Sequence, residues 1–423
     1  MSVRNALTGV RQVVAPLVGD REVRAYYLVF AAVWFAADAY AQALPLYFQE
    51  AGISLAVLGV ARSAASVATL VCEVPAGLLA DRVDRASLAA FAGAVLAVLL
   101  VVLPGARTTL LDGGGVVVAG VVVGIALARQ FVTSSVTPAV SEAVDADRAG
   151  LGWGLRDVGI YGGSALGLAV AGAVTSRTGT VSLAFLPGGV AVLAAAAFLW
   201  VRVADHDLPR SVRIREWTGT LRSELGSVSP VADLRAVSNR RVLGHFCVVE
   251  ALVTAGSGLS FFLLPAYAAD VGFAPAVVLG LFAASNLLGA PLSLVGGLLA
   301  DRYSRKWFYV GNYATETVML AGFAVAGTGV AGGTGARALF LVGLGLFVVQ
   351  TTFEPAVLAY FFDQFDDDEA GRAWSVEGVV ARLTGIVAPA AGGVLYTVDP
   401  GLVFLVAAVL MAGGTAVALT LPE

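Results

Sequence analysis

The chain has 423 residues, of which 58% are hydrophobic and only 13% are charged, and its mean hydropathy is +0.85. A soluble domain is about 45–50% apolar and about 25% charged, so the composition excludes a set of soluble domains and indicates a protein that crosses a membrane many times. The net charge of −4 and the single lysine, Lys306, give no basic patch of the kind that binds nucleic acid.

Twelve stretches are apolar over about the 20 residues that a membrane-spanning helix needs. The first half of the chain contains those at 25–48, 56–80, 87–105, 115–138, 151–175 and 180–203. The second half contains those at 242–267, 275–300, 307–328, 337–362, 373–396 and 400–421. We therefore expect an all-α membrane protein whose twelve transmembrane helices form two six-helix halves.

Polar segments set the expected domain boundaries. Residues 1–24 carry arginines but no signal-peptide cleavage pattern, so they are expected to form a cytoplasmic N-terminal segment. The long polar connection 204–241 is expected to be a cytoplasmic linker between an N-terminal bundle at 25–203 and a C-terminal bundle at 242–423.

The arginines predict the orientation. They concentrate in the N-terminal segment, the linker and the connections on the same side, whereas the other side has only Arg107, Arg177 and Arg337. By the positive-inside rule, both termini are expected to be cytoplasmic. The preference for arginine over lysine is typical of a GC-rich genome, and the acidic loops would suit a salt-adapted prokaryote. We therefore expect a multi-pass protein of a prokaryotic plasma membrane.

The second half of the chain repeats the first. A shift of 220 residues places Gly77–Arg82 on the identical sequence Gly297–Arg302, and places Leu44-Pro45 on Leu264-Pro265. Matches of this kind, spread over the six helices, indicate a duplicated six-helix unit in parallel orientation.

A charged motif occurs where the second helix of each half is expected to leave the membrane on the cytoplasmic side. Its first copy consists of Gly77, Asp81, Arg82 and Arg85, and its second of Gly297, Asp301, Arg302 and Arg305. The glycine is expected to let a neighbouring helix approach, and the aspartate to face helix N-terminal amides. The arginines are expected to pair with carboxylates or lipid phosphates, so that these charges hold one conformation closed.

In these features the chain resembles the major facilitator superfamily of secondary transporters. The resemblance covers nearly the whole chain: the twelve helices, the linker after the sixth, and both copies of the loop motif. Where the family usually has glycine, this sequence has Asp84 and Ser304. The resemblance implies an intracellular gate in which the loop motifs meet helices 5 and 11, whose charged residues there include Asp157, Glu377 and Arg382.

The resemblance also implies a central cavity lined mainly by helices 1, 4, 7 and 10. Each of these helices has one ionisable residue of interest, namely Asp38, Arg129, Glu250 and Glu354, and three of them add a glutamine, namely Gln42, Gln130 and Gln350. Charged groups inside a membrane usually face a bundle interior or water. We therefore expect these residues to bind solute or to couple protons, with Asp38 and Arg129 as a pair; a role in helix packing alone is the alternative. Glu316 has no role in this interpretation.

The sequence thus predicts a transporter and not an enzyme, since it contains no catalytic elbow or metalloprotease motif. We expect proton-coupled alternating access for a small organic solute, with efflux of an amphipathic or cationic compound favoured. The alternatives are a uniporter or uptake symporter for a sugar or other metabolite, and a non-transporting sensor with this fold. The expected partners are the solute, protons and membrane lipid. We expect a monomer with no cofactor and no metal, since the cysteines, Cys72 and Cys247, match no metal-ligand pattern.

Overall fold

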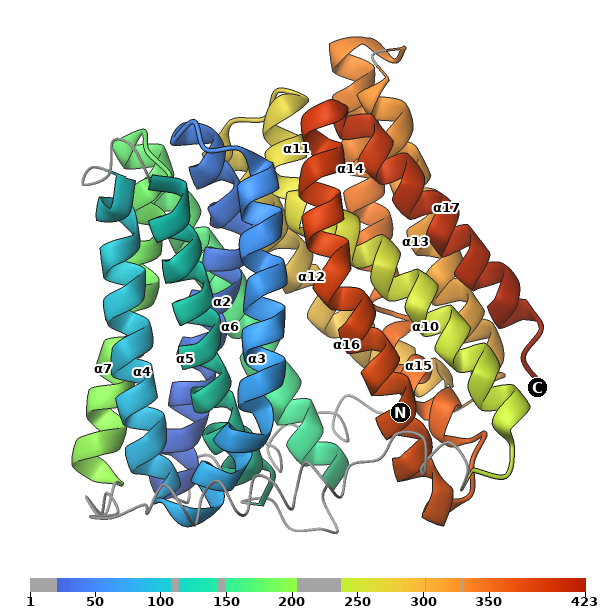
Figure 1. The fold of residues 1–423 in the computed structure, drawn as a ribbon, viewed down its shortest axis with the longest axis horizontal. Helices are drawn as coiled ribbons and strands as arrows, with labels where there is room; N and C mark the ends of the chain where they lie inside the picture. The colour runs from blue at the N-terminus through green and yellow to red at the C-terminus, as the bar shows by residue number, and fades with distance from the viewer. Residues whose placement is uncertain (1–20, 108–113, 143–148, 204–236, 301, 329) are drawn as a thin grey trace, which may run out of the picture. The chain divides into compact units, whose positions relative to one another are not determined.

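The computed structural model describes residues 21–107, 114–142, 149–203, 237–300, 302–328 and 330–423. Over these ranges the chain is helical and contains no strand (Figure 1). The expected N-terminal segment 1–24 and linker 204–241 lie for the most part outside the described residues.

Six long helices account for the first half. They are α2 (Arg21–Glu50), α3 (Leu55–Arg82), α4 (Arg85–Val102), α5 (Gly114–Glu142), α6 (Ala149–Thr178) and α7 (Leu186–Arg202). The 3-10 turns η1 (Leu103–Arg107) and η3 (Ser182–Phe185) follow α4 and precede α7. Each helix overlaps one of the apolar stretches that the sequence predicts.

The second half has two helices that are interrupted. Its elements are α10 (Arg240–Ser260), η4 (Phe261–Leu263), α11 (Leu264–Asp270), α12 (Pro275–Ala300), α13 (Arg305–Gly327), α14 (Gly332–Gln350), α15 (Glu354–Phe362), α16 (Asp367–Val398) and α17 (Pro400–Leu419). The stretches expected to be continuous at 242–267 and 337–362 are broken before Pro265 and Pro355. Proline has no backbone N–H to continue a helix, but it suits a first turn, and each proline lies in the first turn of a new helix.

The number of membrane helices agrees with the sequence. Eleven segments of the described residues are long and apolar enough to cross a membrane. The helix α13, which is 23 residues long and lies between two of them, makes the twelfth. The expected all-α fold of twelve transmembrane helices is therefore confirmed.

The chain divides into two compact units. Unit 1 is Met1–Ala41 with Ala68–Leu225, and unit 2 is Gln42–Val67 with Gly226–Glu423. The end of α2 and the start of α3 therefore belong to unit 2.

The packing inside the units reflects the sequence repeat. In unit 1, α4 packs against α5 and α7; in unit 2, its counterpart α13 packs against α14 and α17 (Figure 1). The duplicated sequence thus folds into a duplicated arrangement of helices.

In each unit, helix backbones approach each other closely at glycines. A Cβ atom on Gly167 of α6 would lie 2.0 Å from the carbonyl oxygen of Phe35 on α2. In unit 2, a Cβ on Gly392 of α16 would lie 2.1 Å from the carbonyl oxygen of Leu259 on α10. Small residues at such contacts let membrane helices pack closely, and any side chain would force these helices apart.

Candidate functional site

In unit 1, an acid and an arginine meet in the membrane helices. Asp38 on α2 interacts electrostatically with Arg129 on α5, as the sequence leads one to expect. The guanidinium carbon of Arg129 lies 5.3 Å from the ring centroid of Trp34, one turn before Asp38. The arginine thus contacts both a negative charge and an aromatic ring, an arrangement that stabilises a cation away from water.

The glutamines on these helices are arranged differently. Gln130, next to Arg129, donates to the hydroxyl of Ser134 on the same helix at 3.4 Å. Gln42 lies in the part of α2 that belongs to unit 2. Asp38 and Arg129 are therefore the pair of expected site residues that unit 1 brings together.

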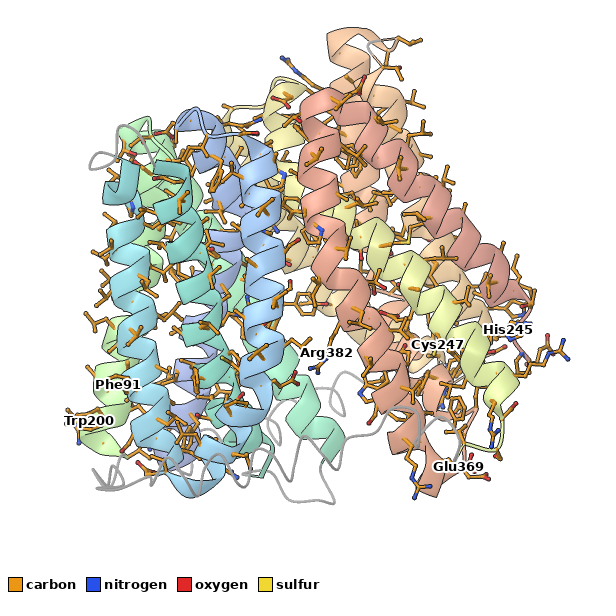
Figure 2. The ribbon with its side chains drawn as sticks, in the orientation of Figure 1. Phe91, Trp200, His245, Cys247, Glu369 and Arg382 are labelled. Carbon is orange, nitrogen blue, oxygen red and sulfur yellow. The ribbon has the colours of Figure 1, made fainter. Side chains whose placement is uncertain are left out.

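In unit 2, carboxylates gather from several helices. Glu250 on α10 accepts a hydrogen bond from the hydroxyl of Thr254. It also interacts electrostatically with Glu377 on α16 and with Glu316 on α13. Glu250 follows Cys247 by one turn of α10 (Figure 2). The structure therefore places Glu377, expected at the gate, within reach of an expected binding-site acid.

Glu316 connects this group to the interrupted helix. Its carboxylate accepts a hydrogen bond from Gln350 Nε2 at 3.1 Å, and Gln350 is the last residue of α14. Glu354, the first residue of α15, also interacts with Glu316. Sequence reasoning assigned no role to Glu316 because its partners lie on other helices; its position at the middle of an apolar helix was the available signal.

The second copy of the loop motif has a partner that the sequence did not indicate. Arg305 Nη1 lies 2.7 Å from Asp363 Oδ1 and 2.8 Å from Oδ2, just after the end of α15. Arg302 is exposed, and Arg382, also exposed, lies on α16 (Figure 2). Asp301 and the side chains of Asp81, Arg82 and Asp157 lie outside what the structure describes.

Among the described residues, no neighbouring helix lies against the motif glycines, so their expected role stays a prediction. A Cβ on Gly77 or Gly297 would meet no described atom within 4 Å. The close contact occurs at the neighbouring residue Gly296, where a Cβ would lie 1.8 Å from the carbonyl oxygen of Thr352. Because consecutive residues point in different directions on a helix, a shift of one residue moves the contact to another face.

In the first copy of the motif, Asp84, which stands where the family usually has glycine, has a local structural role. Asp84 caps α4 by accepting from the backbone N–H of Ser87 at 2.8 Å and of Ala86 at 3.3 Å. Arg85 is the first residue of that helix.

Within unit 2, hydrogen bonds join the end of α2 and the start of α3 to helices of the second half. Gln49 on α2 donates to Asp270 Oδ1 at 3.0 Å, and Tyr396 on α16 donates to Asp270 Oδ2 at 2.6 Å. The hydroxyl of Ser63 on α3 accepts from the backbone N–H of Ala390 at 3.0 Å. Sequence analysis missed these residues because each is an ordinary polar residue near a helix end or in an apolar helix.

No grouping of three or more His, Cys, Asp or Glu side chains within the described ranges is suited to holding a metal ion. The polar groups that the described membrane helices bring together are carboxylates, the guanidinium of Arg129 and amides.

The chain is similar to known proteins in sequence and in fold. Residues 26–357 match the family model described as Major Facilitator Superfamily. Among curated proteins, no sequence matches. Among solved structures, the nucleoside transporter NupG is 13% identical with a TM-score of 0.72, over 95% of this chain and 100% of that one.

Two further solved structures have similar folds. A D-xylose–proton symporter is 12% identical with a TM-score of 0.68, and a bacterial metal transporter is 15% identical with a TM-score of 0.66. Each alignment covers 95% of this chain and 98% of the other. At these sequence identities, the similarity shows a shared fold alone.

Proposed function

Because this chain belongs to the major facilitator superfamily, whose members are transporters and not enzymes, we propose that it is a proton-coupled carrier of a small organic solute. The observation that carries the proposal is the pair of Asp38 and Arg129 inside the membrane helices of unit 1. An acid that exchanges its proton as such a pair forms and separates links proton movement to the conformational change of the helices.

A cationic or amphipathic solute, moved outward, fits the charges best. In unit 2 the carboxylate of Glu250 on α10 interacts electrostatically with that of Glu377 on α16. Like charges in a region of low dielectric attract a cation that separates them. Aromatic rings border the same region, since Tyr309 and Tyr313 stack edge to face with centroids 5.0 Å apart, and rings of this kind favour the apolar part of such a solute.

Uptake of a nucleoside, sugar or other metabolite is the second candidate. It is favoured by the fold relatives, one a nucleoside transporter and one a D-xylose–proton symporter. Amides such as Gln42 and Gln350 are groups that would hydrogen-bond to hydroxyls of a neutral solute.

The test is proton movement in proteoliposomes that contain the purified protein and a pH-sensitive dye inside. Cationic, neutral and anionic solutes are added in turn. We expect cationic amphipaths to trigger a proton flux that Asp38→Asn lowers at least tenfold. The control is Glu50→Gln, which removes an exposed carboxylate from the end of the same helix and should leave the flux unchanged.

The outcomes separate the candidates. A flux driven only by sugars or nucleosides favours the second candidate. Solute that crosses with no proton movement, in wild type and Asp38→Asn alike, contradicts proton coupling.

A further inference from the structure

Glu316 lies at the middle of α13 and is only 3% exposed. Its one described hydrogen bond is the 3.1 Å bond from Gln350 Nε2. A carboxylate at such a position loses its hydration, and a single neutral amide donor does not replace it. The ionised form is therefore strongly disfavoured unless a positive charge is close.

The surrounding charges are negative. The groups that act on Glu316 are the carboxylates of Glu354 and Glu250. Along the sequence, no lysine or arginine occurs between Lys306, at the start of α13, and Arg337.

The helices α14, α15 and α17 pack against α13. The helix α17 has no charged residue, and α15 supplies Glu354. The helix α14 has Arg337, which lies about 20 Å along the helix from Gln350 at 1.5 Å per residue. Among the described residues, the other titratable groups near this face of α13 are Tyr309, Tyr313, Tyr360, Cys247, Glu250 and Glu377. All of these are neutral or acidic, so none compensates a negative Glu316.

A second, independent feature shows that the region around Glu316 lacks hydrogen-bond donors. Asn312, one turn before Glu316 on the same face of α13, is 6% exposed, and its Oδ1 atom has no hydrogen-bond partner among the described residues. The Oε1 atom of Gln350 is also buried, and it too has no partner within the described part of the chain. Both atoms are acceptors. Buried acceptors are nearly always bonded, so the site has a deficit of donors.

We propose that Glu316 is a proton-binding residue of unit 2. The proton forms an O–H bond on the Glu316 carboxyl and is donated to an amide oxygen, that of Asn312 or of Gln350. One proton removes the uncompensated charge and supplies the missing donor, without needing further space in a packed region. When the proton leaves to water, the carboxylate remains, and its bond to Gln350 becomes charge-assisted.

This site would act where the membrane helix is interrupted. Gln350 ends α14, and the break at Thr351–Phe353 separates it from Glu354. A change of charge on Glu316 therefore alters the tie between α13 and the end of α14. That link to transport rests on the proposed function, whereas the protonation of Glu316 does not.

Infrared difference spectroscopy of the purified full-length protein tests the protonation directly. The wild type is expected to show a carboxylic acid C=O band at neutral pH that shifts in D₂O. Glu316→Gln, which keeps the shape of the side chain, should remove that band. The matched control is Glu369→Gln, since the Glu369 carboxylate accepts from the backbone N–H of Ser238 at 3.0 Å and is expected to be ionised; the acid band should persist in it.

Two variants test the acceptors. Asn312→Leu and Gln350→Leu each remove one amide oxygen, and one of them should shift the frequency of the acid band. If Glu316→Gln keeps the acid band and loses a carboxylate band, Glu316 is ionised in the wild type and the proposal is overturned. An acid band that neither amide variant moves would overturn the assigned acceptors, and would do so even where Glu316→Gln does not fold.

The transport assay keeps the two proposals distinct. In proteoliposomes, Glu316→Gln should lower the number of protons moved per solute by one, while Asp38 remains in place. If no solute drives protons in the wild type, proton coupling fails but the infrared result still decides on Glu316.

Discussion

Asp84 stands where the loop motif of the family usually has glycine, and its carboxylate has a structural task. Its Oδ2 atom accepts from the backbone N–H of Ser87 at 2.8 Å and from the Ser87 hydroxyl at 2.6 Å. The first turn of a helix has N–H groups with no partner inside the helix, and an N-cap side chain satisfies them. The unusual residue thus fixes the start of α4.

Replacing Asp84 by alanine should lower the free energy of unfolding by about 0.5–2 kcal/mol, because the N-cap is lost. Ser304 occupies the equivalent position before α13 but its side chain makes no capping bond. Ser304→Ala is therefore the matched control, with an expected change within about 0.5 kcal/mol. Thermal unfolding in detergent measures both, and equal losses would show that the cap contributes nothing.

The contact between Trp34 and Arg129 should be measurable as a coupling energy. A cation over an aromatic ring contributes about 0.5–2 kcal/mol, more when it is desolvated. Trp34→Leu should therefore destabilise the wild type by about 0.5–2 kcal/mol more than it destabilises an Arg129→Leu variant. The double-mutant cycle is measured by thermal unfolding. The same loss in both backgrounds would mean that Trp34 contributes only apolar area.

Single residues were predictable where they contrasted with their surroundings. Asp38 and Arg129 stand out because charged groups are rare in apolar helices. Asp363 does not stand out, since it lies among other acids near a helix end, and its partner Arg305 is 58 residues away. Polar contacts between elements depend on packing that the local sequence does not contain.

At the level of elements, the sequence predicts where helices lie better than where they break. Hydropathy averaged over a membrane-length window does not reveal the break at Phe261–Leu263, because those residues are as apolar as the helix around them. Proline alone does not decide the matter. Pro45 lies inside the unbroken helix α2, whereas Pro265 begins a new one. The presence of a proline in the sequence therefore does not by itself predict where a helix breaks.

The contact between α3 and α16 in unit 2 should be sensitive to a substitution at Gly393. A Cβ on Gly393 would lie 2.5 Å from the carbonyl oxygen of Leu55, whereas a Cβ on Gly385 of the same helix would meet only a methyl group at 3.7 Å. Gly393→Ala should therefore separate α3 from α16. Gly385→Ala should be neutral or stabilise by up to about 1 kcal/mol, because alanine favours a helix.

Disulfide formation measures this separation. Cysteines at Ser63 and Ala390, whose Oγ and N atoms are 3.0 Å apart, report the approach of the two helices. We expect Gly393→Ala to slow their cross-linking at least tenfold and Gly385→Ala to leave it unchanged. Similar rates in both variants would contradict a tight glycine contact.

For the whole molecule, the repeat is the feature that the sequence predicted and the packing reproduces. The helices α4 and α13, which begin at the equivalent residues Arg85 and Arg305, each pack against two helices of corresponding rank. The chemistry of the two units differs within this common frame. Unit 1 pairs Asp38 with an arginine, whereas unit 2 gathers carboxylates around Glu250. Duplication thus explains the scaffold, and later divergence of a few membrane residues explains the site.

The arginines predict the orientation of the whole chain, and cysteine labelling can test that prediction. Cys72 and Cys247 are free and half-buried, so replacing both by alanine gives a cysteine-free background. Thr334, near the start of α14, and the C-terminal residue Glu423 are both exposed. With the arginine-rich side in the cytoplasm, a membrane-impermeant maleimide should label Thr334→Cys in intact cells. It should reach Glu423→Cys only after the membrane is opened. Labelling of Glu423→Cys in intact cells would reverse the orientation and place both loop motifs outside, where they could not form an intracellular gate.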